Sequence, residues 1–193
     1  MFGIGYSFFI RRWTFDVRRS SFKTIPYGIN ERDPVVKRSI KKGFGFGLTS
    51  GVITTLGMMV GLNASTHSKL AVIGGIIAIA IADAFSDAMG IHIAEESENR
   101  HSTREIWEAT FSTLVSKFII ALTFVVPVLV FRLHVAVWLS IVWGLTLIII
   151  FSYHMATQQG VKPYKVVLEH VAIVVLVIII THYVGKWIAT LCC

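Results

Sequence analysis

Five long apolar stretches follow one another along the chain, and short polar segments separate them. They cover residues 44–62, 69–94, 109–131, 134–154 and 166–190. About 20 apolar residues in helical form are needed to cross the hydrocarbon of a bilayer. Each stretch is continuously apolar rather than alternating, and a helix satisfies its own backbone hydrogen bonds in lipid. The pattern predicts an all-α polytopic membrane protein with five transmembrane helices.

The composition agrees with this architecture. Of the 193 residues, 54% are hydrophobic and only 15% are charged, which excludes an ordinary soluble domain. Only Arg132 and Leu133 separate the third and fourth stretches, so those two helices must be antiparallel neighbours. Pro127, near the outer end of the third stretch, predicts a kink.

The basic residues are concentrated on one predicted side of the membrane. Ten of the 18 Lys and Arg residues precede the first stretch, and four more lie in the second and fourth connections. Lys69, Arg132 and Lys186 lie on the opposite side. Cytoplasmic loops carry the excess of positive charge, so the N-terminus is predicted to be cytoplasmic and the C-terminus extracytoplasmic or lumenal. The pattern leaves open which membrane holds the protein.

The chain divides into two predicted regions. Residues 1–43 form a basic cytoplasmic N-terminal segment, and residues 44–193 form the five-helix transmembrane domain, with a short acidic cytoplasmic loop at 95–108. The N-terminal segment is either an amphipathic anchor in the membrane interface or a partly ordered tail. We expect its partner to be anionic lipid headgroups and not nucleic acid. The adjacent Cys192 and Cys193 give neither a disulfide framework nor a metal-binding spacing.

Two acidic residues lie inside the second apolar stretch. Asp83 and Asp87 are four residues apart, so they share one face of the predicted helix. Two ionised carboxylates so placed repel each other, which favours a bound cation or a shared proton. Ionisable residues inside a membrane indicate a functional site by default. The alternative is that these acids only stabilise helix packing.

Lys117 lies well inside the third stretch, too deep for its ammonium to reach the interface easily. It therefore needs an acidic partner on a neighbouring helix, and we expect Asp87 to be that partner. If the acids only stabilise packing, they pair with Lys117 or accept hydrogen bonds from hydroxyl groups of the first stretch. Those hydroxyl groups belong to Ser50, Thr54 and Thr55.

Beyond Gly90 the second helix is predicted to extend into the cytoplasm with carboxylates and histidines. The candidate metal ligands there are His92, Glu95, Glu96, Glu98, Glu105 and Glu108. Several of them share a helix face at spacings of three or four residues. Carboxylates with an imidazole suit Fe²⁺, Mn²⁺ or Zn²⁺. Two alternatives remain open: a solvated acidic face, and a capping box in which Glu105 completes a helix start at Ser102.

The first stretch carries small residues at helical spacing and two thioethers. Gly43, Gly47 and Gly51 are four residues apart, and a second pair of glycines repeats the spacing at 57 and 61. Small residues on one stripe let another backbone approach closely, so we expect this helix at the centre of packing or in a dimer interface. Met58 and Met59 either face a metal path or pack against lipid and the core.

The first two stretches resemble the vacuolar iron transporter family. The run SGVITTLGMMVG is similar to the family's D-G-(hydrophobic)-x-T-T motif, and IADAFSDAMG is similar to its A-D-G/A-x-S-M-G motif. The matching residues of the first motif are Gly51, Thr54 and Thr55. Those of the second are Ala82, Asp83, Ala84 and Ser86, followed by Ser97 and Glu98.

The resemblance implies a homodimer with a path near the dimer interface and a second helix extended into the cytoplasm. The chain looks like a short, divergent member, because the family's large cytoplasmic insert is reduced to Glu95–Glu108. Ser50 stands where the family has its membrane aspartate, and Asp87 stands where the family has a methionine. Our hypothesis is compensation, in which Asp87 supplies the acid and Met58 and Met59 supply the thioethers.

We therefore expect a secondary transporter that exports Fe²⁺ or Mn²⁺ from the cytoplasm, with H⁺ as coupling ion and no tightly bound cofactor. Ligand type does not decide between the two metals. No nucleophile–base pair, phosphate-binding loop or HExxH motif is present, so an enzyme is not expected. The alternative function is a non-transporting structural or partner-binding membrane protein. The predicted transport path comprises Ser50, Thr54, Met58, Met59, Asp83, Asp87 and Lys117, and the two aspartates are also predicted metal ligands.

Overall fold

A computed structural model of the chain describes residues 35–98 and 101–192. They belong to the compact unit Glu31–Cys193, and Met1–Asn30 lies outside the described residues. Most of the predicted basic N-terminal segment, including its candidate amphipathic anchor, therefore lies outside the described part. Cys193 and residues 99–100 of the predicted acidic loop also lie outside it.

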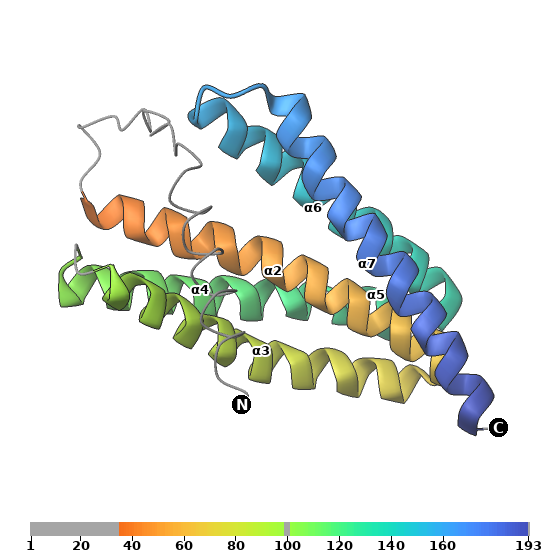
Figure 1. Cartoon of the computed structure of the whole chain (residues 1–193). Helices are drawn as coiled ribbons and strands as arrows, with labels where there is room; N and C mark the ends of the chain where they lie inside the picture. The colour runs from red at the N-terminus through yellow and green to blue at the C-terminus, as the bar shows by residue number, and fades with distance from the viewer. Residues whose placement is uncertain (1–34, 99–100, 193) are drawn as a thin grey trace, which may run out of the picture. The chain divides into compact units, whose positions relative to one another are not determined.

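The described residues form six helices and no strand (Figure 1). Five spans within them are long and apolar enough to cross a membrane, and α4 and α5 together make one of the five. The prediction of an all-helical protein with five potential transmembrane spans is confirmed. The helices are α2 (Val35–Thr66), α3 (Lys69–Ser97), α4 (Thr103–Thr123), α5 (Val125–Val130), α6 (Leu133–Gln158) and α7 (Pro163–Cys192).

The helices extend beyond the apolar stretches that predicted them. α2 begins at Val35 and not at residue 44, and it takes up the last basic turns of the predicted N-terminal segment. α3 continues to Ser97, and α4 begins at Thr103, so most of the predicted acidic loop at 95–108 is helical. Helices tolerate polar residues once they leave the hydrocarbon, and for that reason hydropathy underestimates their length.

Pro127 interrupts the third span, as predicted. α4 ends at Thr123 and α5 begins at Val125, four residues or fewer before the proline. Proline has no N–H to donate to the carbonyl four residues earlier, and its ring collides with that carbonyl. The N–H of Phe124 donates instead to the carbonyl of Ala121 at 3.1 Å, which closes the end of α4.

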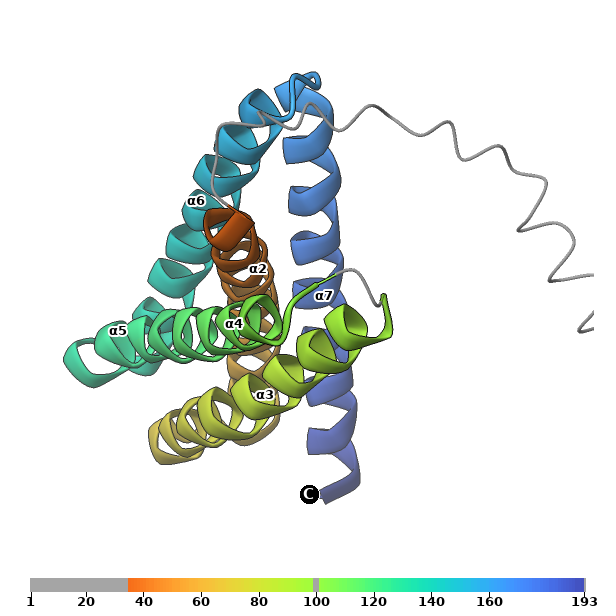
Figure 2. The same cartoon turned by 90° about the vertical axis from the view of Figure 1, so that its left-hand side faces the viewer.

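α2 is the central helix of the described unit. It contacts α3 and α4 on one side and the α6–α7 hairpin on the other (Figures 1 and 2). A Cβ added to Gly47 would lie 2.6 Å from the carbonyl oxygen of Thr113 on α4. A Cβ added to Gly185 of α7 would lie 2.8 Å from the Cβ of Ala64 on α2. Small residues thus let α2 approach two neighbours closely, which confirms its predicted central place in packing.

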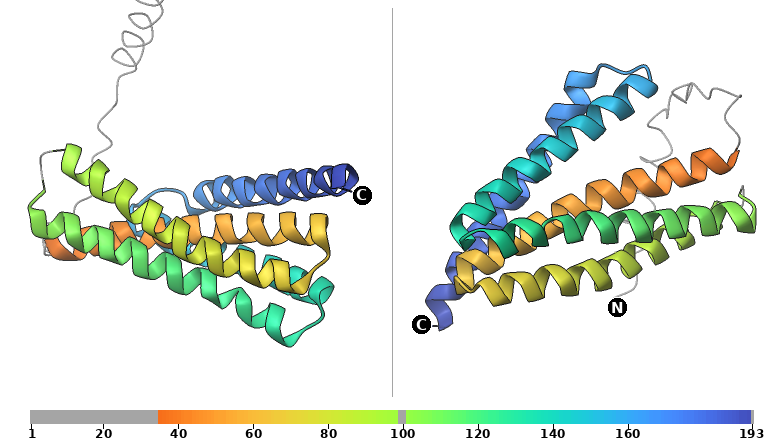
Figure 3. Two further views of the ribbon diagram at one scale, coloured as in Figure 1. Left: turned by 90° about the horizontal axis from the view of Figure 1, so that it is seen from below. Right: turned by 180° about the vertical axis from the view of Figure 1, so that it is seen from behind.

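The right-hand view of Figure 3 shows α2 between α3 and α4 on one side and α6 and α7 on the other. The hydrophobic core surrounds α2 where these two groups of helices meet. A buried stripe on α3 faces it, and α6 closes the opposite side. Gly144 of α6 allows this approach, because an added Cβ there would lie 2.6 Å from a methyl group of Leu56. The largest core members are Leu56, Met59, Ile76, Phe124 and Ile148.

Candidate functional site

One ammonium and two carboxylates meet between α2, α3 and α4. The Nζ of Lys117 on α4 lies 2.5 Å from Oδ2 of Asp83 and forms a second ion pair with Oδ2 of Asp87. Lys117 also donates to Oγ of Ser50 on α2 at 2.9 Å. Ser50 in turn donates to Oδ2 of Asp87 at 2.6 Å. We call these four residues the Lys117 cluster.

The cluster forms because the sequence brings three helices close together at this level. Asp83 and Asp87 are one helical turn apart on α3, so both carboxylates point to the same neighbour. On α2, Gly51 makes room for the lysine: a Cβ added there would lie 3.3 Å from both Cγ and the carbonyl oxygen of Lys117. The aliphatic stem of Lys117 therefore passes over a glycine, and its ammonium reaches the acids.

The cluster carries one negative charge in excess when all three groups are ionised. Lys117 is 1% exposed, whereas the side chains of Asp83 and Asp87 are 25% and 19% exposed. A buried ammonium requires paired acids, because its desolvation is costly. One acid would balance the charge, and here there are two. The cluster therefore has one carboxylate more than its ammonium balances.

The predicted partner of Lys117 is confirmed, since Asp87 pairs with it. The structure adds Asp83 to the same ammonium. Of the hydroxyl groups proposed as partners of the acids, Ser50 takes that role, whereas Thr54 Oγ1 donates to the carbonyl of Ser50 at 2.9 Å.

The two methionines of the predicted path do not reach the carboxylates. Met59 is fully buried in the hydrophobic core. Met58 packs against Gly75 of α3, where an added Cβ would lie 3.6 Å from its sulfur. Gly75 precedes Asp83 by about 12 Å along α3, at 1.5 Å rise per residue. Of the residues in the compensation hypothesis, Asp87 therefore lies in the cluster, whereas the thioethers of Met58 and Met59 do not.

Thr54 and Met58 instead line a groove along α2, between α3 and α7. Its volume is about 450 Å³. Small residues form part of its lining, and the glycines among them let α2 and α7 pack closely. These residues are Gly57, Gly61, Ser65 and Gly185.

A second group of charges connects the start of α2 to the end of α3. Glu95 is only 2% exposed and forms an ion pair with Lys42. Nε2 of His101 lies 3.3 Å from Glu95 and 3.4 Å from Glu98. Two of the predicted metal ligands thus have protein partners. Sequence reasoning missed Lys42 and His101 as partners, because neither spacing nor hydropathy relates residue 42 to residue 95.

His92 also has protein partners. Its Nδ1 lies 3.0 Å from Oγ1 of Thr110, and its ring meets the ring of Trp107 edge to face with 4.8 Å between centroids. Glu96, its predicted neighbour on the same helix face, is exposed. His92 therefore joins α3 to α4, as a packing histidine does.

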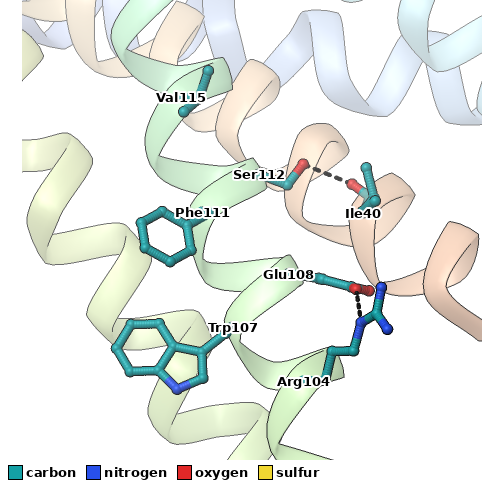
Figure 4. A pocket seen from close by; sticks show the side chains of 7 residues that line it. All are labelled: Ile40, Arg104, Trp107, Glu108, Phe111, Ser112 and Val115. Atoms are coloured by element: carbon teal, nitrogen blue, oxygen red, sulfur yellow. Dashed lines mark hydrogen bonds and ion pairs between the residues drawn. The ribbon is translucent and has the colours of Figure 1, made fainter.

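The carboxylates at the start of α4 have local partners. Glu105 accepts from the backbone N–H of Ser102 at 2.7 Å, and the reciprocal bond completes a capping box, which confirms that alternative. Glu108 accepts from Nε of Arg104 at 2.8 Å (Figure 4). The pair lies at the edge of an apolar recess of about 460 Å³ beside Trp107.

Among the described residues, no three His, Cys, Asp or Glu side chains gather closely enough to hold a metal ion. The predicted ligands divide between the Lys117 cluster and the connection between α3 and α4. The candidate site with excess charge and partly exposed carboxylates is the Lys117 cluster.

No protein-family model matches the chain, and no curated protein matches it significantly in sequence.

Proposed function

We propose that the chain is a secondary transporter that exports a divalent transition metal, Fe²⁺ or Mn²⁺, from the cytoplasm in exchange for protons. The observation that carries this proposal is the Lys117 cluster, with two carboxylates and one ammonium inside the spans. Acids inside a membrane are costly and rare, and they mark ion paths and proton relays. The excess negative charge attracts either a cation or a proton, which are the two species that an antiporter exchanges.

The ligand chemistry supports a hard or intermediate divalent ion. Asp83, Asp87 and Ser50 offer carboxylate and hydroxyl oxygens, which suit Mn²⁺ and Fe²⁺ better than a soft monovalent metal. Protonation of the same carboxylates would release the metal, so metal and proton compete for one site. That competition is the minimum requirement for exchange.

We infer that the functional unit is a homodimer. The groove along α2 supports this, because it offers a hollow of about 450 Å³ between α3 and α7 in which side chains of a partner helix could pack. A partner at this face would also cover part of α7. Only 6% of the apolar 18-residue segment of that helix is buried within the protein. The resemblance to vacuolar iron transporters implies the same assembly.

We also propose the predicted orientation, with the N-terminus in the cytoplasm and α3 extending into the cytoplasm at its C-terminal end. The charges at that end support it. Lys42, Arg104 and the carboxylates of Glu95 and Glu98 gather where α2 begins and α3 ends, and the opposite end carries Lys69 and Arg132.

Metal flux in proteoliposomes tests the transport function. We expect Asp87→Asn to lower Mn²⁺ uptake at least tenfold while the protein remains folded, since one carboxylate is lost from the site. Asp83→Asn should have the same effect. Glu169→Gln is the matched control, because it neutralises an exposed acid of α7 outside the cluster. Wild-type flux in both aspartate variants would contradict the proposal.

The second candidate function is a non-transporting scaffold or partner-binding subunit. The ion pairs of Lys117 with both aspartates favour it, because such pairs also serve to fix helix packing. On this alternative the wild-type protein transports no metal, and the aspartate variants change only stability. The same flux measurement therefore separates the two functions.

A further inference from the structure

The ammonium of Lys117 occupies the position between the carboxylates that a bound cation would take. It donates hydrogen bonds to Oδ2 of Asp87 and Oγ of Ser50, and it forms an ion pair with Oδ2 of Asp83. All three partners are oxygen atoms, the atom type that hard divalent cations prefer as ligands.

The stem of Lys117 has four carbons with rotatable bonds, and it passes over Gly51, where an added Cβ would lie 3.3 Å from its Cγ. The carboxylates are not sealed behind the lysine, because Asp83 and Asp87 keep 25% and 19% of their side-chain surface exposed.

We propose that Lys117 is a tethered competitor, which fills the cation position in the state described and must be displaced before a metal ion binds. The proposal rests on the transport function proposed above and deepens it. With the ammonium in place the two carboxylates keep one negative charge in excess, whereas a divalent ion neutralises both. The competitor therefore selects for divalent over monovalent ions, because an ion of single charge gains nothing over the ammonium.

Mn²⁺ binding to the purified full-length protein, followed by the electron paramagnetic resonance signal of free Mn²⁺, tests this role. We expect Lys117→Met, which keeps the stem and removes the charge, to bind Mn²⁺ at least tenfold more tightly than wild type. We also expect K⁺ to compete measurably with Mn²⁺ in this variant but not in wild type. Lys69→Met is the control: Lys69 donates to the carbonyls of Leu129 and Phe131 at the other end of the bundle, and its loss should leave Mn²⁺ affinity unchanged.

A second comparison covers the case in which Lys117→Met does not fold. Asp83→Asn removes one carboxylate from the cluster. The double variant Asp83→Asn with Lys117→Met also removes the ammonium, so it keeps the net charge of the wild-type cluster, one negative charge. Tighter Mn²⁺ binding by the double variant than by Asp83→Asn alone supports the proposal.

The outcomes separate the proposal from the transport function on which it rests. If Asp87→Asn abolishes Mn²⁺ binding but both lysine variants bind no more tightly than their parents, the site stands and the tethered competitor is overturned. If neither wild type nor either lysine variant binds Mn²⁺, both proposals fail. If Lys117→Met binds Mn²⁺ and wild type does not, the result supports the proposal that Lys117 excludes the metal ion completely in the wild-type protein.

Discussion

At the scale of single residues, Lys117 and its two acids form a charged cluster within the apolar spans. The ammonium is almost fully buried, and both carboxylates share it. Either aspartate alone would balance its charge, whereas losing both would leave a buried charge without a partner. Such a charge is among the costliest defects in a folded protein.

The aspartates should therefore be strongly non-additive in stability. Asp83→Asn and Asp87→Asn each leave Lys117 paired, so each should cost at most about 1 kcal/mol. The double variant leaves the ammonium unpaired and should cost about 3–5 kcal/mol. Unfolding in detergent, followed by circular dichroism, measures the three free energies. Simple additivity would mean that the ammonium does not depend on these acids.

The sequence predicted part of this cluster and not the whole. The depth of Lys117 required an acid, and Asp87 was correctly named from its place on the neighbouring helix. The four-residue spacing showed that Asp83 shares that face, but not that one ammonium would serve both. Of the two alternatives for Met58 and Met59, Met59 packs in the core, and hydropathy alone could not decide between them because it does not show which face of α2 meets which neighbour.

The ion pair between Lys42 and Glu95 could not be predicted from the sequence. Lys42 and Glu95 are far apart in the chain, and only the packing of α2 against α3 brings them together. By contrast, the capping box at Ser102 and the break at Pro127 were predicted correctly, since each depends on a few neighbouring residues. Features that depend on neighbouring residues could be predicted from the sequence, whereas ion pairs between residues far apart in the chain could not.

The Lys42–Glu95 pair gives a second prediction. Glu95 is almost fully buried, so Lys42→Met removes the ammonium that pairs with its carboxylate. We expect a loss of about 1–3 kcal/mol, the cost of a buried polar group with too few partners. Glu98→Gln is the control, since Glu98 is exposed and should change stability little. Equal stability of the two variants in chemical unfolding would contradict the importance of this pair.

At the scale of whole helices, the glycines of α2 decide where the cluster can form. Gly47 lies one turn before Gly51, and both keep α4 close to α2. A wider separation of these helices would carry Lys117 away from Ser50. The position of the site is therefore a consequence of helix packing, not of the charged residues alone.

Gly47→Ala tests this dependence. The added Cβ would lie 2.6 Å from the carbonyl oxygen of Thr113, so α4 must move or the helix must strain, at a cost of about 1–3 kcal/mol. Gly90→Ala is the matched control: nothing lies within 4 Å of its added Cβ among the described residues, and alanine favours helix by up to about 1 kcal/mol. Thermal unfolding should thus shift in opposite directions. A stable Gly47→Ala variant would show that close approach is not required.

At the scale of the whole molecule, the orientation that we propose from the five spans and the distribution of charge places the C-terminus on the side opposite the cytoplasm. The chain contains two cysteines, Cys192 and Cys193. They provide a natural label for that end of the protein.

A membrane-impermeant maleimide should therefore label the wild-type protein in intact cells or in vesicles of native orientation. In a variant with both cysteines replaced by serine and a cysteine introduced at Ser20, labelling should require permeabilised membranes. Labelling of the Ser20→Cys variant in intact cells would reverse the proposed topology.

Exchange of a divalent metal for protons at the Lys117 cluster is tested by measuring Mn²⁺ uptake and lumenal pH together in proteoliposomes that are acidic inside. We expect uptake that depends on the pH gradient, a rise in lumenal pH in wild type, and the loss of both in Asp87→Asn. Absence of gradient-dependent uptake in wild type, or equal uptake in the variant, would contradict the proposed exchange.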